Sequence, residues 1–571
     1  MNETRASLLQ QAVERHQAGD LERAIQAYQH VLAESPRDPD ALHMLGVALA
    51  QSGRPAQAVP LIRCALEKYA DRGLVHFNLG NALAALQRHT EALAAYQRAA
   101  ELAPDRPEVH EAACRMALEL ERYAAALASA ERALALRPGD GYVLLNKASA
   151  LIALERHEEA LDCCDRAMRL IPEHWGAQLR RGVALAKLGR LAEAEPCLVR
   201  AVQLNPGYPA AHTDLGNLYG AQGRQELAVA SFARALELRP DSSDARWNMA
   251  LLKLRQGELA AGWELYEERF TMDAQRGEPL RLRERRWTGR ESLTGKRLLI
   301  WTERGLGDTL QFCRYAPLIR DLGADVTLEV PSRLKTLLQG QFAGVRLIGH
   351  GEPAPPFDYQ CPLLSVARAF GTELATIPAA VPYLQADPAA VARWSRRLPP
   401  GPALRVGVAW QGNADAERNW ARGRSWPLAA LEPLSRLPGV CLISLQTGPG
   451  AGQLAAVAFA DRIVSFGKEL DAGPHAFRDT AAILPSLDLV ISSDTSLVHL
   501  AGALGAPVWV ALHLTSEWRW LRERNDSPWY PTARLFRQRI AGDWGTVVDD
   551  MCRALGRGEV RRADSTHGYS T

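Results

Sequence analysis

A repeat of 34 residues runs through the first half of the chain and limits its fold more than any other feature. Small residues recur at one position of each unit: Gly46, Gly80, Cys114, Ala148, Gly182, Gly216 and Ala250. Prolines close the units between Pro36 and Pro240. Small residues at fixed places let two antiparallel helices approach closely, and proline ends the second helix. Because no single unit can bury its own apolar face, the units must stack into a solenoid.

The unit that starts at His212 reads His-x-x-Leu-Gly-x-x-Tyr and continues through Ala228 and Phe232 to Pro240. This pattern resembles the tetratricopeptide repeat. We therefore predict an α-solenoid over residues 1–270, with about seven full repeats and a partial eighth. The partial unit ends in aromatic side chains that we expect to dock it onto the following domain, namely Trp263, Tyr266 and Phe270.

The first helices of such repeats line a concave surface. At the sixth position of that helix four repeats carry Asn78, Asn146, Asp214 and Asn248. In O-GlcNAc transferase, whose architecture this chain resembles, asparagines at that place hold the backbone of the substrate peptide. The resemblance implies a groove for a protein acceptor. The alternative is a series of ordinary polar residues on a solvated face, and Met44, Ala112 and Arg180 interrupt it.

The second half of the chain centres on residues 489–512. A short apolar run leads into the polar turn 492–496, and apolar residues then recur at helical spacing up to Leu504. Gly505 and Pro507 end that helix before a second apolar strand. This strand–turn–helix–strand unit places its polar turn at the carboxyl end of a strand, where open α/β sheets bind ligands. Hydroxyls and backbone N–H groups at a helix start suit a phosphate or diphosphate.

The same stretch, from Asp494 to Pro507, reads Asp-Thr-Ser-x-x-His-Leu-Ala-x-Ala-Leu-Gly-x-Pro. It resembles a motif of the heptosyltransferase-type glycosyltransferases (family 9), with Ser496 in place of the family's glycine. The resemblance implies that Thr495, Ser496 and His499 meet the diphosphate of a nucleotide-sugar donor. It further implies that Asp494 hydrogen-bonds the donor sugar.

A glycine-rich turn follows a predicted strand at residues 297–301. Its Gly305-Leu-Gly307-Asp308 sequence resembles the amino-terminal motif of the same family, in which the aspartate is the proposed general base. Transfer of a sugar to a hydroxyl requires a carboxylate near the acceptor oxygen, so Asp308 is the candidate catalytic residue. The alternative is that Asp308 caps a helix beginning at Thr309, and the two roles are compatible.

Further candidates come from the last third of the chain. By resemblance Arg424, two residues before Trp426, contacts the donor diphosphate; the alternative is a surface arginine. Gln446 ends a predicted strand and is a candidate contact to the base or ribose. We expect the aromatic residues between 517 and 531 to pack at a lobe interface in preference to forming a platform for sugar.

Composition limits the possible partners. The 571 residues carry a net charge of +2, so no field attracts nucleic acid or a membrane. The 9 cysteines are scattered, which favours a reduced cytoplasmic protein. The chain starts without a secretory signal and has no apolar run of the ~18 residues that a membrane span needs. We expect a soluble protein with neither membrane insertion nor a nucleic-acid partner.

The resemblances cover nearly the whole chain. They imply the solenoid (1–270), a linker (271–295), and a GT-B fold of two Rossmann-like α/β lobes, 296–385 for the acceptor and 386–556 for the donor. A disordered tail (557–571) follows. The catalytic half has no Asp-x-Asp motif, so we expect no metal and no cofactor besides the nucleotide-sugar co-substrate.

This order of domains is similar to that of bacterial flagellin-type protein glycosyltransferases. The implied activity is inverting transfer of a sugar to Ser or Thr of a protein. The alternatives are a lipid or polysaccharide glycosyltransferase docked by its repeats to an assembly, and a non-catalytic adaptor.

Overall fold

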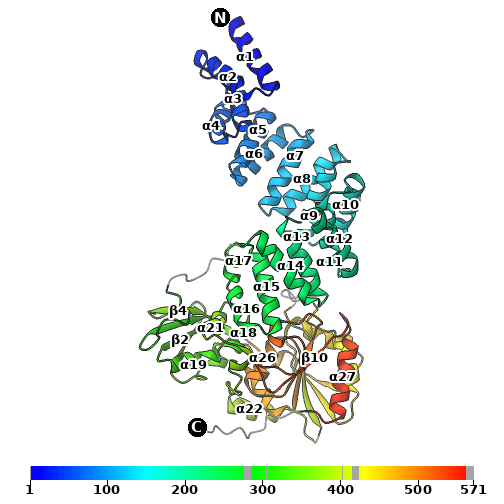
Figure 1. Cartoon of the computed structure of the whole chain (residues 1–571). Helices are drawn as coiled ribbons and strands as arrows, with labels where there is room; N and C mark the ends of the chain where they lie inside the picture. Colours follow the sequence, from blue (N-terminus) through cyan, green and yellow to red (C-terminus); the bar gives the residue numbers. More distant parts are fainter. Residues whose placement is uncertain (1, 276–284, 304, 402, 414–422, 561–571) are drawn as a thin grey trace. The chain divides into compact units, whose positions relative to one another are not determined.

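The computed structural model describes residues 2–275, 285–303, 305–401, 403–413 and 423–560 (Figure 1). The chain forms two compact units, Met1–Arg239 and Pro240–Thr571. The predicted boundary at residue 270 thus lies inside the second unit. Each unit is described separately.

The first unit consists of antiparallel helix pairs, seven among its described residues, and the predicted α-solenoid is confirmed. The pairs are α1 (Asn2–Gln17) with α2 (Leu21–Glu34), α3 (Pro39–Gln51) with α4 (Pro55–Leu66), α5 (Gly73–Ala85) with α6 (His89–Leu102), α7 (Pro107–Glu119) with α8 (Tyr123–Leu136), α9 (Gly141–Ala153) with α10 (His157–Leu170), α11 (Trp175–Lys187) with α12 (Leu191–Leu204), and α13 (Pro209–Ala221) with α14 (Gln225–Leu238).

Close approach within each pair depends on the small residue of the repeat. Four glycines face a large side chain sixteen positions later, in the pairs Gly46–Ile62, Gly80–Tyr96, Gly182–Leu198 and Gly216–Phe232. A Cβ on Gly80 would lie 2.6 Å from the Tyr96 ring. Where the small residue is Cys114 or Ala148, the residue sixteen positions later is Ala130 or Cys164. Volume at one position is therefore balanced at the other, as a close-packed interior requires.

The turn inside each pair has one residue in the left-handed conformation, again 34 positions apart. These residues are Gly19, Gly53, Gln87, Glu121, Glu155, Gly189, Gly223 and Gly257. In the three central repeats a non-glycine residue adopts this conformation, which costs an L-residue about 1–2 kcal/mol. The central turns therefore carry backbone strain that the outer turns avoid.

The second unit begins with α15 (Ser243–Gln256), α16 (Leu259–Tyr266) and α17 (Arg269–Gln275). The pair α15–α16 continues the repeat pattern but packs into the core of the α/β part. The Trp263 side chain is 2% exposed, and its Nε1 donates to the carbonyl of Thr372 at 3.0 Å. Its ring lies edge-on to Trp518 at 5.2 Å. The partial repeat docks as its aromatic residues predicted.

The first sheet of this unit has four parallel strands in the order β3-β2-β1-β4. They are β1 (Arg297–Trp301), β2 (Asp325–Val330), β3 (Val345–Gly349) and β4 (Tyr359–Pro362), with α18 (Leu306–Phe312), α19 (Tyr315–Asp321), α20 (Lys335–Leu338) and α21 (Val366–Ala369). Residues 358–361 were expected to form a loop. They provide β4 instead, because Tyr359 to Pro362 pair with β1.

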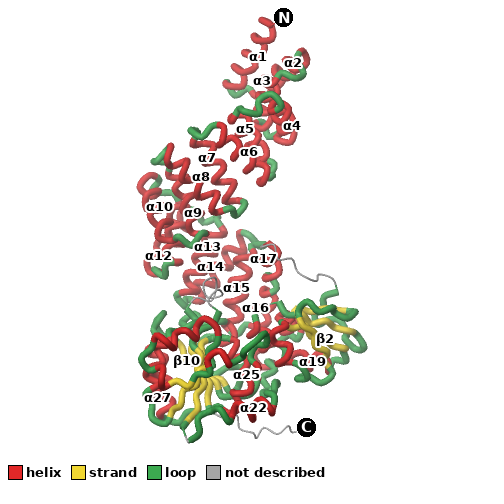
Figure 2. Tube along the Cα trace, turned by 180° about the vertical axis from the view of Figure 1, so that it is seen from behind, coloured by secondary structure: helices red, strands yellow, loops and turns green. Residues whose placement is uncertain are grey.

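The second sheet has six parallel strands in the order β10-β9-β8-β5-β6-β7, separate from the first (Figure 2). Its strands are β5 (Leu404–Ala409), β6 (Val440–Ser444), β7 (Ile463–Val464), β8 (Leu489–Ser493), β9 (Val508–Leu512) and β10 (Ala533–Arg537). Its helices are α22 (Pro388–Ser395), α24 (Glu432–Ser435), α25 (Arg478–Ile483), α26 (Ser496–Ala503) and α27 (Trp544–Gly556). The unit β8–α26–β9 lies where the sequence predicts it.

Two predicted surface segments are partly structured. In the linker, Trp287 is 3% exposed and its backbone N–H donates to Gln360 at 2.9 Å, so residues 285–295 are not a solvated connector. In the tail, Glu559 pairs with Arg534 at 2.6 Å. Residues 276–284 of the linker and 561–571 of the tail lie outside the described residues. In the described part of the chain, no helix combines the length and apolar composition that crossing a membrane requires.

Candidate ligand-binding site

The turns that follow β1 and β8 both lie at the carboxyl ends of their strands, and the helices that begin there, α18 and α26, pack together. Gly307 is the point of contact. A Cβ at this position would lie 2.8 Å from Cδ2 of His499 and 3.3 Å from Oγ of Ser496. The structure therefore brings the glycine-rich turn against the helix of the second motif. Gly305 is not constrained in this way, since its Cβ would meet only Oδ2 of Asp308, at 3.6 Å.

Asp308 occupies a different helical position from the one predicted. Helix α18 begins at Leu306 with Gly305 as its N-cap residue, so Asp308 lies in the first turn and does not cap a helix starting at Thr309. Its Oδ2 accepts the backbone N–H of Gly305 at 3.0 Å. This contact satisfies a backbone donor at the helix start, as the acidic residue of a capping box does. The side chain therefore stabilises the helix from a position that also faces the second sheet.

Arg519 joins Asp308 from the other sheet. It lies in the 3₁₀ turn η9 (Trp518–Trp520) after β9, and forms ion pairs with Asp308 and Glu517. Its Nε donates to Oε1 of Gln311 at 2.7 Å, and its side chain is 7% exposed. Burial opposes its charge, but Glu517 and Asp308 outweigh burial and raise the pKa of Arg519. Sequence reasoning missed this residue, because an arginine between two tryptophans gives no local sign of a partner 211 positions away.

Asp494 follows β8 and is 5% exposed. Its Oδ2 accepts no hydrogen bond from any residue that the structure describes. Burial and then the charge of Glu517 raise the pKa of Asp494 to about 6, against the opposing effects of the Trp520 indole, Arg519 and Arg424. A buried acceptor without a donor is unusual in native proteins and calls for a bound partner. A hydroxyl or amide of a ligand would supply the missing donor.

His499 lies one turn into α26 and is buried. Its Nδ1 is 3.0 Å from the Tyr530 hydroxyl, and its ring stacks on Trp520 with centroids 5.7 Å apart. Burial, followed by the charges of Arg519, Arg314 and Arg424, lowers the pKa of His499 well below its usual value. The imidazole is therefore neutral at physiological pH. It can take part in a hydrogen bond with a ligand but does not bring a positive charge.

Thr495 and Ser496 form the start of α26. Thr495 is the N-cap residue with an extended backbone, and its Oγ1 lies 3.1 Å from Oγ of Ser492. The neighbouring Ser493 hydroxyl is buried and has no hydrogen-bond partner among the described residues. Free backbone N–H groups at a helix start favour anions. This end of β8 therefore combines the predicted anion-binding helix start with two unpartnered buried side chains.

The remaining donor-site candidates differ in what surrounds them. Arg424 acts electrostatically on both Asp494 and His499, which places it beside the motif. Gln446 has its amide engaged within the sheet. Its Oε1 accepts the N–H groups of Trp410 and Gln411 at 3.0 and 2.9 Å, and its Nε2 donates to the Gln411 carbonyl at 2.9 Å. We assign Gln446 the role of joining the ends of β5 and β6, while its contact to a base or ribose remains a prediction.

The aromatic residues between 517 and 531 pack between the two sheets, as expected. The Trp529 ring lies 5.5 Å from that of Phe312 in α18. Arg314 of the first sheet's helical layer donates to the carbonyl of Trp529 at 2.8 Å and to that of Pro378 at 2.9 Å. These contacts fix the helix pair α18–α26 and with it the spacing of the site.

The predicted acceptor residues do not fall within one unit. Asn78, Asn146 and Asp214 belong to α5, α9 and α13 of the first unit, whereas Asn248 belongs to α15 of the second. The Nδ2 of Asn78 lies 2.9 Å from Nε2 of His43, a side chain of the preceding repeat. A role of these residues in holding a peptide remains a prediction.

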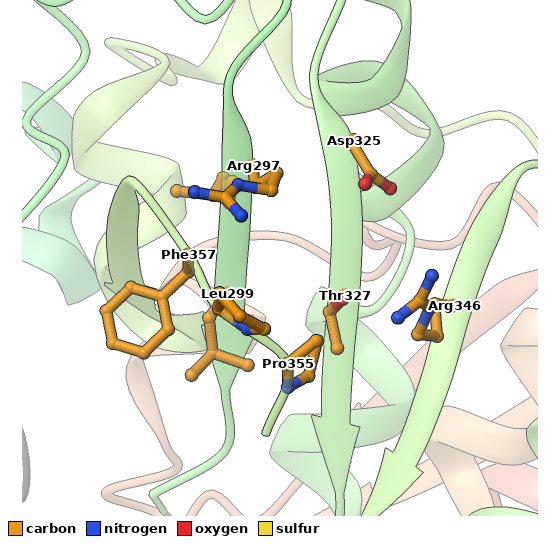
Figure 3. A pocket seen from close by; sticks show the side chains of 9 residues that line it. Arg297, Leu299, Asp325, Thr327, Arg346, Pro355 and Phe357 are labelled. Atoms are coloured by element: carbon orange, nitrogen blue, oxygen red, sulfur yellow. The ribbon is translucent and has the colours of Figure 1, made fainter.

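A separate cavity of about 190 Å³ opens at the amino ends of β1 and β2 (Figure 3). Its lining includes Arg297, Thr327, Arg346 and Phe357. Because β1 runs from Arg297 to Trp301, this cavity lies at the opposite end of the strand from the glycine-rich turn. It contains none of the predicted site residues. Across the described residues, no group of three or more His, Cys, Asp or Glu side chains is placed to hold a metal ion.

Comparison with known proteins identifies the repeats. Models of the tetratricopeptide repeat match residues 9–72, 43–107, 115–171, 166–209 and 216–257. Protein FlbA of Caulobacter vibrioides is 31% identical over 335 residues, which cover 54% of this chain and 54% of FlbA. The chain thus spans about half the length of this curated relative.

Two solved tetratricopeptide proteins are also similar. The protein TTC0263 of Thermus thermophilus is 30% identical, with a TM-score of 0.29, over 32% of this chain and 99% of that one. YrrB, described as having an unusual peptide-binding site, is 26% identical, with a TM-score of 0.27, over 32% of this chain and 95% of that one. This chain is therefore similar to FlbA, and tetratricopeptide repeats extend across its residues 9–257.

Proposed function

We propose that the second unit is an inverting, metal-independent glycosyltransferase that works in the cytoplasm. It moves a sugar from a nucleotide-sugar donor to a Ser or Thr hydroxyl of a protein acceptor bound by the repeats. One observation carries the proposal: the Asp308 carboxylate and the unpartnered Asp494 carboxylate flank the contact between α18 and α26, at the carboxyl ends of two parallel sheets. Two such sheets are compatible with the GT-B fold that the motifs imply.

The donor side would stabilise the leaving group. When the bond between the anomeric carbon and the diphosphate breaks, the diphosphate leaves with the electron pair and gains negative charge. Backbone N–H groups at the start of α26 and the guanidinium of Arg424 are suited to meet that charge. Asp494 would accept a hydrogen bond from a hydroxyl of the donor sugar, which satisfies its buried Oδ2.

The acceptor side would supply the base. Asp308 takes the proton of the acceptor hydroxyl while the oxygen bonds to the anomeric carbon from the face opposite the diphosphate, and this direction of attack inverts the configuration. The ion pair with Arg519 keeps the carboxylate ionised and also makes it a weaker base. Proton transfer therefore accompanies the departure of the diphosphate and does not precede it.

The repeats would supply the acceptor. Tetratricopeptide solenoids offer extended concave surfaces to protein partners. The first unit presents Asn78, Asn146 and Asp214 at equivalent positions of three repeats. A protein acceptor is thus the substrate class that suits a chain in which this solenoid precedes the site.

Donor binding is tested by thermal stability against a panel of UDP-, GDP-, ADP-, TDP- and CMP-sugars. A donor at 100 times its Kd should add about 2.7 kcal/mol of stability. We expect Asp494→Ala and Arg424→Ala to abolish the shift. The control Arg436→Ala, which removes an exposed ion pair with Glu432, should leave it unchanged. If no nucleotide sugar shifts the wild-type melt, the chain is better explained as an adaptor.

Transfer is tested with Asp308→Asn and a labelled form of the donor that binds. This variant should bind the donor as the wild type does and transfer no sugar. Transfer at the wild-type rate would show that Asp308 is not the base. Label recovered in a lipid or polysaccharide fraction, with none in protein, would replace the protein acceptor by the alternative acceptor class.

A further inference from the structure

A group of cationic side chains at the edge of the second sheet takes no part in the mechanism above. His513 follows β9 and Arg537 ends β10. In the sheet register Leu512 pairs with Arg537, and Ser493 of β8 pairs with Ala511. Asp494, His513 and Arg537 are therefore neighbours at the carboxyl ends of three adjacent strands, beside the start of α26.

Arg255 approaches this edge from the last repeat. It lies in the final turn of α15, which packs against η9. Its Nε is buried and donates no hydrogen bond to any described residue. No carboxylate of the described chain lies within ion-pair distance of its guanidinium. A buried arginine without a partner is costly to the fold, so another role is needed to explain it.

The other two cations also lack acidic partners. Arg537 donates to the carbonyls of Arg524 and Trp520 at 3.1 and 2.6 Å and to the Ser516 hydroxyl at 2.7 Å, all of them neutral groups. Nδ1 of His513 is buried without a hydrogen-bond partner among the described residues. Donor groups on three separate elements thus surround one edge of the sheet.

Electrostatics agrees with this geometry. Burial and then the charge of Arg255 lower the pKa of His513 to about 4 and that of Arg537 to about 10. Burial lowers the pKa of Arg255 as well. The acidic groups that face the cluster are Glu517, which already pairs with Arg519, and Asp494. The local charges therefore repel one another in the unliganded protein, and a bound anion would offset them.

We infer that Arg255, His513 and Arg537 form an anion subsite that binds the diphosphate group of the ligand together with the start of α26. Guanidinium groups with several N–H donors match the several oxygens of a phosphate. The last repeat then does more than support the α/β part, because it supplies a side chain that touches the ligand. This inference rests on the proposed class of ligand, a nucleoside diphosphate derivative, but not on the transfer of a sugar.

The test uses the full chain and two probes, pyrophosphate and the nucleoside diphosphates UDP, GDP and ADP, at constant ionic strength. We expect Arg255→Met to weaken binding of the probe at least tenfold, as loss of one charge-assisted contact does. The same variant should melt no lower than the wild type without ligand, because it removes an unpaired buried charge. The control is Arg246→Met on the same helix, whose arginine pairs with Glu268 at 3.3 Å and should not affect binding.

A merely structural role of Arg255 makes the opposite prediction, namely a lower melting temperature and unchanged affinity, and that result would overturn the inference. His513→Leu provides a second variant on the sheet itself and should also weaken binding. If nucleotide sugars bind and Arg255→Met leaves their Kd unchanged, the subsite is wrong and the proposed function stands. If Arg255→Met weakens pyrophosphate binding but no sugar is ever transferred, the subsite stands and the proposed function fails. If the wild type binds neither probe, the subsite is also overturned.

Discussion

Gly307 and His499 lie so close together that a Cβ on the glycine would be 2.8 Å from Cδ2 of the histidine. They belong to α18 and α26, helices that follow strands of different sheets. The absence of a side chain at one position therefore sets the spacing between the two halves of the candidate site.

Gly307→Ala should force α18 and α26 apart. We expect a loss of about 1–3 kcal/mol in the free energy of unfolding, the usual cost of overpacking, together with weaker ligand binding. Denaturant unfolding measures the first and ligand-induced melting shifts the second. Gly305→Ala is the matched control, since its Cβ would meet only Oδ2 of Asp308, at 3.6 Å. Equal losses for both variants would show that the close approach at residue 307 is not important.

Asp494→Asn should stabilise the unliganded protein at neutral pH. The native pKa of Asp494 is about 6, above its ordinary value, so ionisation disfavours the folded state. The contribution of the protonated carboxyl to stability is complete below about pH 4 and is lost as the pH rises through 6. The variant avoids that loss and should gain on the order of 2 kcal/mol at pH 8 but little at pH 4.

Unfolding of Asp494→Asn at pH 4 and pH 8 tests this expectation, with the exposed Asp461→Asn as control. A gain of equal size at both pH values would contradict the ionisation argument. The variant should also lose ligand affinity, so that a more stable protein binds less well.

Glu121→Gly should stabilise the chain by about 1 kcal/mol. Glu121 has φ of 56° in the turn between α7 and α8, a conformation that glycine adopts without steric cost. The same substitution at Glu119, the last residue of α7, should destabilise by about 1 kcal/mol because glycine is a poor helix former. Thermal unfolding of both variants gives the two signs, and a loss at residue 121 would contradict the strain assigned to the central turns.

Trp263→Ala should destabilise the second unit by about 3–5 kcal/mol, the range for removing a buried aromatic side chain. It also leaves the Thr372 carbonyl without its donor. The control is Val229→Ala, at the equivalent position of the preceding repeat and in the first unit, where we expect about 1 kcal/mol or less. Hydrogen exchange in β1 and β8 separates the two, and unchanged exchange there in Trp263→Ala would show that the eighth repeat is not part of that core.

The sequence predicted those parts of the fold that have strong local patterns. The period of 34 residues gave the helix pairs, and the strand–helix–strand unit around α26 appeared because buried parallel strands read as short apolar runs. Strand β10 was missed, since Arg534 and Arg537 interrupt its apolar character. The start of α18 was missed because Gly305 and Gly307 suggest a loop, although the second glycine is required by a neighbouring helix.

The same distinction applies to the candidate site. Residues within a motif, such as Asp308 and Asp494, could be chosen from the sequence alone. Arg519 and Arg255 could not, because their positions beside the site depend on contacts between segments far apart in the chain. Gln446 looked like a ligand contact from its place at a strand end, yet the strand ends themselves use its amide.

The pair α15–α16 has the sequence of a repeat and the core of an enzyme-like unit, and this has a consequence for how such chains diverge. Duplication or loss of a 34-residue segment before residue 240 alters only the length of the solenoid. Loss of the eighth segment would instead uncover Trp518 and its aromatic neighbours. The number of repeats can therefore drift between relatives, while the last repeat must be inherited together with the sheets.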